Sequence, residues 1–445
     1  MSNNDISGGA NFKSPVRLRR PDRLQSELVV CCPDDLVSKT HPVRNVAAVV
    51  ATMDLSLFCV PIKAREGNAG RDATDPALLV GLWVYGNIRG IGSARELARQ
   101  CIDSDPFKWL CGGVSLNHHL LSDFRVDHAD ALDELFAQVI ALLVDKKLVK
   151  VKRISQDGLR VRAGAGASSF RREATLEQLL KDAQERVEQL RKQVDDPEHS
   201  AAVGAAKAAA VKRAAEDRAS RLQQAIEQLP ELKNKREQAA KKAGRGKRGQ
   251  EILDKQPRVS TTDPDARVMK MPNGGFNPAF NVQLATDTES RAILAVEVSN
   301  EGSDSAGLSE PLRQQVEQRT GQKVQQHLLD GGYVKTDDIE KAHQQSVELF
   351  MPPKTAHAPQ NKGHELEPKP GDSPAILEWK KRMSSEAAKE VYKQRASTSE
   401  PVNADLRCQR GLGQMTVRGL PKARCVALWC ALAYNLMHFG AALLS

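Results

Sequence analysis

Aromatic residues are scarce in this chain, since Phe, Trp and Tyr make up only 4% of its 445 residues. Its hydrophobic cores must therefore consist mostly of aliphatic side chains. The eight cysteines form no CxxC pair, and most of them lie among apolar neighbours. This usage excludes a disulfide framework and a cysteine zinc ribbon. It is typical of small buried side chains in a reducing compartment.

Long hydrophobic segments are also lacking. No uninterrupted run of about 18 apolar residues occurs, and the first residues have no apolar stretch of the kind found in signal peptides. The apolar stretch 425–444 approaches the length of a membrane span, but Asn435 and His438 interrupt it. We interpret this stretch as a buried core helix, and we expect a cytoplasmic, nucleoid-associated protein.

Positive charge is in excess, with 65 Lys and Arg against 56 Asp and Glu and a net charge of +9. A basic balance at this length favours a polyanionic partner, most often nucleic acid. A basic enzyme without a polymeric partner has the same composition, so charge alone does not decide. At roughly 100–200 residues per domain, the chain is long enough for two or three domains.

The composition divides the chain into a basic flexible arm, a helical domain and a mixed α/β domain, which we place at residues 1–33, 34–150 and 151–445. In the helical domain, Asp75 before Pro76 and Ser93 three residues before Glu96 are helix-start signals. Successive short helices of this kind fit a helix-turn-helix DNA-binding domain, and they fit other helical bundles equally well.

The segment 171–256 is rich in Ala, Glu, Lys, Gln, Arg and Leu, and its leucines keep approximately heptad spacing. It predicts two long helices, the second around 205–229, which are joined near Pro197 and form an antiparallel hairpin inserted into the α/β domain. The stretch 241–248 is strongly basic and interrupted by glycine, so it could touch phosphates. A solvated helical hairpin without any chemistry is the leading alternative, because charged runs are usually solvent-exposed faces.

Outside this insert, the α/β domain alternates between strand and helix patterns. A strand over 151–163, irregular at Gly158, is followed by a β-hairpin over 277–298, a helix, a strand ending at Asp330, a further helix and a further strand. A long helix is expected over 374–395. This order is that of the RNase H-like fold, in which the first and fourth strands lie side by side.

That arrangement would bring Asp157, on the first strand, close to Asp330, at the end of the fourth. Carboxylates suit phosphodiester chemistry because they hold divalent metal ions such as Mg²⁺, which activate the attacking oxygen and stabilise the leaving one. A lone Asp before Gly-Gly is more often a turn residue. Asp263 and Asp265 are further possible ligands, although a turn is again the better interpretation.

Several motifs taken together resemble the insertion-sequence transposases of the DDE class, most closely the group called IS-eleven-eighty-two, which has a coiled insert early in its catalytic domain. They are ISQDGLRVRAGAG, TTDPDARVMKM, FNPAFNVQLATD, LLDGGY and YKQRASTSEPVNADLR, with LNHHLLSDFR in the helical part. The resemblance covers about residues 40–440. It implies a helical N-terminal transposase domain before an RNase H-like catalytic core.

The resemblance also implies site residues. Asp157, Asp330 and Glu400 match the three catalytic, metal-binding acids, with Mg²⁺ or Mn²⁺ as cofactor. Tyr392, Arg395 and Arg407 match residues that contact DNA, with arginine at position 407 where lysine is common, which keeps the charge but not the geometry. The five-residue step from Arg395 to Glu400 requires an offset or a bend in a helix.

Arg267 and Lys270 are expected near DNA as well. The resemblance implies a DNA transposase that cleaves one strand at the ends of its element and joins the 3′ end to target DNA, acting on double-stranded DNA as a homodimer. The alternatives are a metal-dependent nuclease on the same fold without strand transfer, and an inactive DNA-binding derivative.

Overall fold

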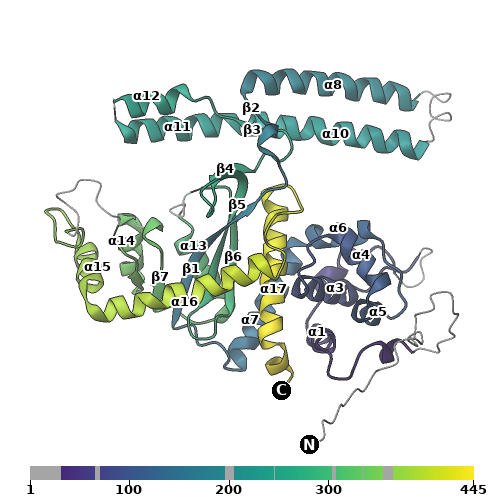
Figure 1. The fold of residues 1–445 in the computed structure, drawn as a ribbon, viewed down its shortest axis with the longest axis horizontal. Helices are drawn as coiled ribbons and strands as arrows, with labels where there is room; N and C mark the ends of the chain where they lie inside the picture. The colour runs from purple at the N-terminus through teal and green to yellow at the C-terminus, as the bar shows by residue number, and fades with distance from the viewer. Residues whose placement is uncertain are drawn as a thin grey trace, which may run out of the picture.

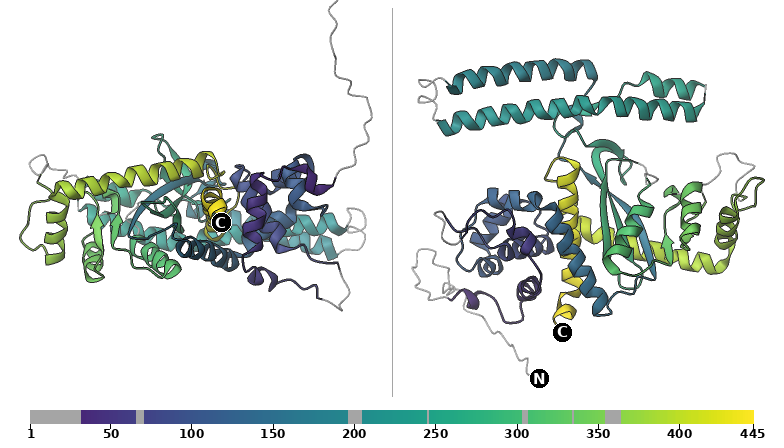
Figure 2. Two further views of the ribbon diagram at one scale, coloured as in Figure 1. Left: turned by 90° about the horizontal axis from the view of Figure 1, so that it is seen from below. Right: turned by 180° about the vertical axis from the view of Figure 1, so that it is seen from behind.

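The structure is a computed structural model that describes residues 32–65, 71–195, 205–244, 246–302, 307–333, 335–353 and 364–445. A mixed sheet lies at its centre, with a group of N-terminal helices on one side and a long helical arm across the top (Figures 1 and 2). The basic arm expected over residues 1–33 falls almost entirely outside the described residues.

The N-terminal part is helical, as expected. Its elements are η1 (Pro33–Leu36), α1 (Pro42–Ala51), α2 (Ser56–Cys59), α3 (Pro76–Ile88), α4 (Ala94–Asp103), α5 (Asp105–Cys111), α6 (His118–Asp127) and α7 (Ala129–Asp145). The helix-start signals act as predicted. Asp75 accepts a hydrogen bond from the backbone N–H of Ala77, and Ser93 accepts one from that of Glu96. Each bond satisfies an N–H that the first helical turn leaves free.

The sheet contains β1 (Arg153–Arg162), β4 (Arg267–Lys270), β5 (Phe276–Asp287), β6 (Ile293–Ser299), β7 (Gln326–Leu328) and β8 (Glu348–Phe350). Its strands run in the order β4-β5-β1-β7-β8, and β6 pairs with β5. The helices α13 (Ser309–Thr320) and α14 (Thr336–Gln344) connect β6 to β7 and β7 to β8. This mixed sheet with its helical N-terminal region fits an RNase H-like core.

The strand order confirms the expected neighbourhood of the first and fourth core strands, because β1 pairs in parallel with β7. The expected irregularity at Gly158 was wrong. Nine consecutive residues of β1 pair with β5 in one unbroken antiparallel register, and Gly158 lies opposite Gln283. The ladder bonds of β5 keep this glycine in a regular strand, so its lack of a side chain produces no bulge here.

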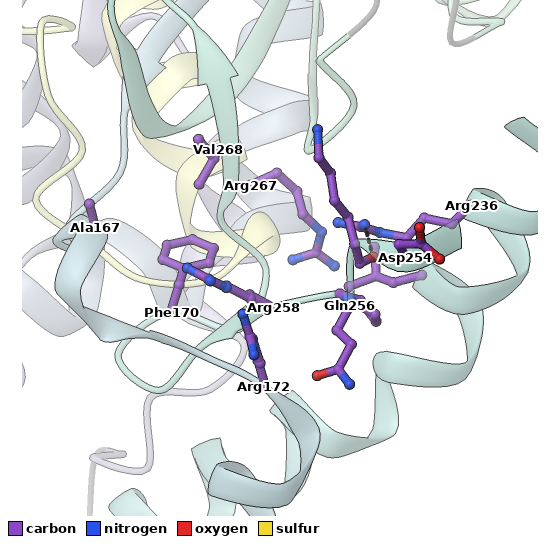
Figure 3. A pocket seen from close by; sticks show the side chains of 12 residues that line it. Ala167, Phe170, Arg172, Arg236, Asp254, Gln256, Arg258, Arg267 and Val268 are labelled. Carbon is purple, nitrogen blue, oxygen red and sulfur yellow. Dashed lines mark hydrogen bonds between the residues drawn. The ribbon is translucent and has the colours of Figure 1, made fainter. Parts of the chain in front are cut away.

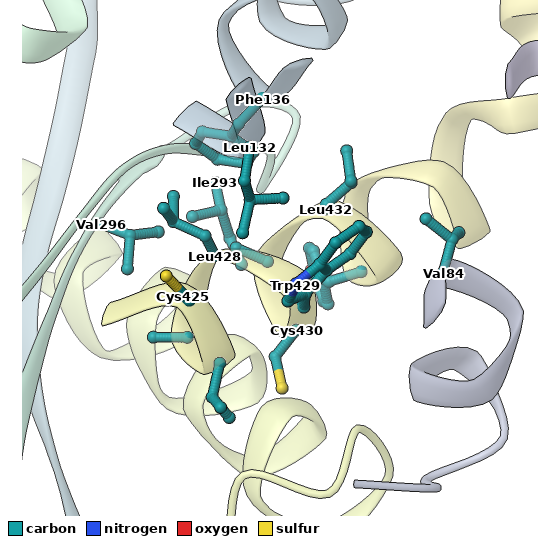
Figure 4. Packing of buried hydrophobic residues seen from close by; sticks show 14 of the residues in the cluster. Val84, Leu132, Phe136, Ile293, Val296, Cys425, Leu428, Trp429, Cys430 and Leu432 are labelled. Atoms are coloured by element: carbon teal, nitrogen blue, oxygen red, sulfur yellow. The ribbon is translucent and has the colours of Figure 1, made fainter. Parts of the chain in front are cut away.

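The apolar C-terminal segment forms α17 (Leu420–Leu444), which is long and apolar enough to cross a membrane but has 67% of its most apolar window buried inside the protein. It lies between the N-terminal helices and the sheet, with Trp429 and Leu432 among side chains of both parts (Figure 4). Asn435 is buried and bonds the backbone of Ile293 in β6. The interpretation as a core helix is supported by this packing.

The insert arises between two short strands, β2 (Phe170–Arg171) and β3 (Val259–Ser260), which pair with each other. Its helices are α8 (Glu173–Asp195), α10 (Ala205–Glu227), α11 (Leu229–Ala243) and α12 (Lys247–Asp254). The two long helices expected are α8 and α10, and the second ends at Glu227, close to the expected bound. The helices α11 and α12, which Gly244 separates, were not predicted. The joint expected near Pro197 lies outside the described residues. The α8–α10 pair has its own small core around Leu176 and Leu222.

The helix expected over 374–395 was also wrong in its bounds, because α15 (Pro374–Ser384) ends and α16 (Glu386–Cys408) begins around Ser385. The backbone of Ser385 is extended, and its side chain caps α16 by accepting a hydrogen bond from the N–H of Ala388. The long helix α16 then crosses the face of the sheet toward α17 (Figure 1).

Candidate active site

Two carboxylates meet where β1 and β7 run side by side. The parallel ladder pairs Arg153 with Gln326 and Ser155 with Leu328, so each residue of β1 lies opposite the residue 173 positions later. The same offset, continued two residues beyond the ladder, brings Asp157 level with Asp330. The two acids thus come from chain segments that only the parallel pairing of their strands brings together.

A single guanidinium lies between these acids. Arg395, on α16, has Nη1 3.5 Å from Oδ1 of Asp157 and Nη2 3.9 Å from Oδ1 of Asp330. Its Nε donates to the hydroxyl of Tyr392 at 3.3 Å. Burial pushes the pKa of Arg395 down, but Asp157, Tyr392 and Asp330 outweigh it and hold that pKa above its ordinary value. The acids therefore concentrate negative charge at one point.

Polar side chains along α16 fix this helix against β1. Asn403 Nδ2 donates to Oδ2 of Asp157 at 3.0 Å, and the hydroxyls of Ser399 and Ser155 lie 2.6 Å apart. Five residues before Ser399, Gln394 accepts a hydrogen bond from Arg153 at 2.5 Å. The sequence pattern did not predict Asn403, Ser399 or Gln394 as site residues, because an amide or hydroxyl on a helix carries no motif of its own.

Glu400 lies beside this face and not on it. Its side chain is exposed, and within the described part of the chain it makes no hydrogen bond or ion pair. An offset or a bend before Pro401 was expected between Arg395 and Glu400, and α16 continues through that proline to Cys408. The structure thus brings together Asp157, Asp330, Arg395 and Tyr392, and it does not bring Glu400 into contact with them.

The other residues expected to touch DNA lie farther along the sheet. Arg407 donates to the backbone oxygen of Arg160 at 3.5 Å and lines a cavity of about 260 Å³ with Arg160 and Arg162. Arg267 and Lys270 are the first and last residues of β4, an edge strand. Lys270 is exposed, whereas Arg267 is partly buried. The site therefore continues into basic surface toward β4.

Asp263 and Asp265 serve a structural turn. Asp263 Oδ1 accepts from the backbone N–H of Gly419 at 3.2 Å, and Asp265 Oδ2 accepts from that of Leu420 at 2.9 Å. Both N–H groups lie at the start of α17, where carboxylates also interact favourably with the helix dipole. The turn interpretation of these two acids is supported, and they anchor the C-terminal helix.

Asp157 and Asp330 offer hard oxygen ligands of the kind that a divalent ion such as Mg²⁺ prefers, and this ion needs few protein ligands because it retains several waters. Within the described residues the buried Nη1 of Arg395 has no hydrogen-bond partner, although a carboxylate oxygen of Asp157 lies 3.5 Å away. Among the same residues no cluster of three metal-ligating side chains forms. The chemistry of the two aspartates therefore fits such an ion.

Two segments of the chain match known protein families. Residues 32–127 match the family described as Transposase domain (DUF772), and residues 252–436 match Transposase DDE domain. The second matched segment contains Asp330 and Glu400, whereas Asp157 lies between the two matched segments. No curated protein and no solved structure matches the chain.

The sheet, the paired aspartates and the second match define a polynucleotidyl transferase of the DDE class. The two matches together identify the chain as a DNA transposase of an insertion sequence, an enzyme of a mobile element.

Proposed function

We propose that Asp157, Asp330 and Glu400 form the catalytic centre, which hydrolyses one strand at each end of the insertion sequence and joins the new 3′ end to target DNA. The observation that carries this proposal is the convergence of Asp157 and Asp330 on Arg395, at 3.5 and 3.9 Å. Two carboxylates held around one cation form a site where divalent cations are favoured. The group within this class, IS-eleven-eighty-two-like, is part of the proposal.

Glu400 completes the triad in this proposal. It lies three residues before Asn403, whose amide touches Asp157, so the two side chains leave the helix about 60° apart. Because Glu400 is exposed and unpaired among the described residues, no existing contact opposes its rotation toward Asp157. The hydrogen bonds of Ser399 and Asn403 hold the helix turn that carries Glu400 against β1.

Asp157, Asp330 and Glu400 would hold Mg²⁺ or Mn²⁺, which when bound supplies an activated water and neutralises charge on the leaving oxygen. Arg395 then exchanges its carboxylate partners for a phosphate oxygen of the DNA, which a guanidinium binds through paired N–H groups. Tyr392 orients Arg395 through its hydroxyl. Arg407, Lys270 and Arg267 extend the phosphate contacts along the sheet.

The helical region 34–150 and the basic arm would recognise the ends of the element, and two copies of the chain would pair two ends. We place the protein in the cytoplasm, bound to the nucleoid. The helical region shares one continuous core with the sheet through α17, so end recognition and catalysis are coupled through packed side chains rather than through a linker.

The proposal is tested with a plasmid that carries the gene and its flanking DNA. Asp330→Ala should abolish strand cleavage and leave DNA binding unchanged, because it removes a metal ligand from a site whose fold rests on other contacts. Asp337→Ala, which removes an exposed carboxylate from α14, is the matched control and should cleave normally.

Two outcomes would overturn parts of this proposal. Cleavage by purified Asp330→Ala would remove this residue from the centre. Cleavage by the unaltered protein without any joined product on a gel would make it a nuclease on the same fold, and binding without cleavage would make it an inactive DNA-binding derivative.

A further inference from the structure

A cavity of about 760 Å³ lies at the base of the insert, where the helical arm meets the edge of the sheet. Its walls come from three parts of the chain: the β2–β3 strands with their flanks, the helices α11 and α12, and strand β4. Figure 3 shows Arg172 and Arg258 beside Phe170, Arg267 next to them, and Arg236 and Asp254 across the cavity. The insert is thus joined to the catalytic sheet around an open, basic hollow.

Positive charge in this cavity is not balanced. It is lined by five cationic side chains and one carboxylate, Asp254; the cations are Arg172, Arg236, Lys255, Arg258 and Arg267. Within the described residues none of these five forms an ion pair. Their neighbours behave differently, because Lys233 pairs with Glu173 at 2.8 Å and Lys235 pairs with Glu231 at 2.7 Å. What distinguishes the cavity is that five cations without an ion-pair partner among the described residues gather around a single carboxylate.

Two of these arginines are held opposite each other by the strands. The β2–β3 ladder pairs Phe170 with Ser260 and Arg171 with Val259, so the next pair in register is Arg172 and Arg258. Like charges directly opposite on paired strands repel each other. An anion between the two side chains would convert this repulsion into attraction.

Two further arginines are already partly removed from water. Arg267 donates to the backbone oxygens of Pro264 and Ala266 and to the side chain of Gln228, and Arg236 donates to the backbone oxygen of Lys255. Burial lowers the pKa of both guanidinium groups. The charge of Arg267 is partly offset by nearby carboxylates, Asp265 first among them, whereas burial is the one cause of the lowered pKa of Arg236. An anion would therefore interact more strongly with Arg236 than with Arg267.

We propose that this cavity binds backbone phosphates of duplex DNA, which makes the base of the insert a DNA contact separate from the catalytic centre. The inference rests on the proposed function for its choice of polyanion. The cavity is larger than a single phosphate requires, and it opens on the edge strand that also carries exposed Lys270. The apolar side chains of Phe170, Leu232 and Val268 lie among the cations and suit the sugars between phosphates.

Such contacts do not read sequence, because phosphates are the same along any duplex. The test therefore uses a 40-base-pair duplex of arbitrary sequence as the probe, the full chain, and a titration of salt. Each phosphate contact contributes about 0.9 to the slope of log affinity against log salt concentration. Arg172→Ala with Arg258→Ala removes two exposed side chains that make no hydrogen bond or ion pair with described residues.

This double variant should bind the duplex about 10- to 100-fold more weakly near physiological salt, with a slope smaller by about 1.8. The matched control is Lys181→Ala with Arg186→Ala, which removes the same charge from exposed positions on α8, outside the cavity. It should change the slope by less than about 0.3, since remote charges are screened over about 10 Å. Arg172→Lys with Arg258→Lys should retain most of the slope.

An equal slope for the cavity variant and its control would overturn the proposal. If the double variant does not fold, Lys255→Ala replaces it, with an expected loss of about 0.9 in slope, and an unchanged slope would again be decisive. Failure of the proposed function would give a different result from failure of the cavity proposal. The unaltered protein would then bind no duplex at all, or it would bind duplex through the cavity and never cleave it.

Discussion

At the scale of single residues, the centre depends on side chains that hold the acids in place. Asn403 is one of these, since its amide donates to Asp157 at 3.0 Å. Asn403→Ala should lower the cleavage rate about ten-fold and raise the Mg²⁺ concentration needed for half-maximal rate, because an unsupported carboxylate is less well oriented for the ion. The check is a magnesium titration of cleavage, with Lys393→Ala on the exposed face of α16 as the control.

The variant Asn403→Asp tests whether Asn403 acts by orienting the carboxylate of Asp157 or only by stabilising the fold. It keeps the size of the side chain but places a negative charge against Asp157, so cleavage should fall further while thermal stability without metal also falls. A magnesium requirement that stays the same in both Asn403 variants would contradict the positioning role.

Glu400 makes the sharper residue-scale prediction. Glu400→Gln should reduce cleavage at least about 100-fold, as expected for loss of a metal ligand, and should leave the thermal midpoint without metal unchanged, because the exposed side chain has no partner to lose. Glu390→Gln is the control on the same helix, where Glu390 only pairs with exposed Lys393. Near-normal cleavage by Glu400→Gln would mean that another residue supplies the third ligand.

Some residues of the candidate site could be predicted from the sequence and others could not. Asp157 and Asp330 were predictable as neighbours because the order of strands places β1 beside β7, and parallel strands align their ends. Asn403, Ser399 and Gln394 were not, because their role comes from the packing of α16 on the sheet. Glu400 was assigned by resemblance alone, and its place in the centre remains a prediction.

At the scale of elements, α17 joins the two parts of the protein. Buried Asn435 receives the N–H of Ile293 at 3.0 Å and donates to its backbone oxygen at 2.8 Å. β6 is interrupted in its pairing with β5 near this point, where the register shifts between Ala285 and Thr286. Ile293 pairs with Thr286 of β5 beside this shift, and the side chain of Asn435 satisfies both of its backbone polar groups.

Asn435→Leu keeps the volume but leaves both backbone groups of Ile293 buried without partners. It should lower the free energy of unfolding by about 2–6 kcal/mol, from a penalty of about 1–3 kcal/mol for each of the two unsatisfied groups. Chemical denaturation measures this, with Met437→Ala at an exposed position of the same helix as the control. A loss no larger than that of the control would show that water or a shifted backbone satisfies Ile293.

Element boundaries were harder to predict than element types. Helix pattern continues from α15 into α16, so the sequence predicted one helix where the structure has two. The break occurs at Ser385, whose extended backbone ends α15 and whose side chain caps α16. The end of α10 was predicted within two residues, whereas the helices α11 and α12 that follow it were not predicted.

At the scale of the whole molecule, the insert is an arm that has its own hydrophobic core and is attached beside the catalytic sheet. Its core around Leu176 and Leu222 is separate from the continuous core of the helical region, α17 and the sheet. The chain leaves and re-enters the sheet region through the paired strands β2 and β3, so its two junctions are already adjacent. The arm can therefore be removed without breaking a strand of the catalytic sheet.

Replacing residues 173–257 by a two-residue Asn-Gly turn should preserve the catalytic sheet, because that turn suits two paired strands and joins Arg172 to Arg258 in the register of β2 and β3. The shortened protein should keep a single cooperative unfolding transition, with a midpoint lowered by only a few degrees through loss of the Gln228 contacts to Asp265 and Arg267. Its affinity for duplex DNA should fall at least as far as that of the Arg172→Ala, Arg258→Ala variant, because Arg236 and Lys255 leave with the arm. Calorimetry and the same salt titration measure both quantities. If the shortened protein binds DNA as tightly as the full chain, the arm has no part in DNA binding. The cations of the cavity at the foot of the arm would then bind an anion other than DNA.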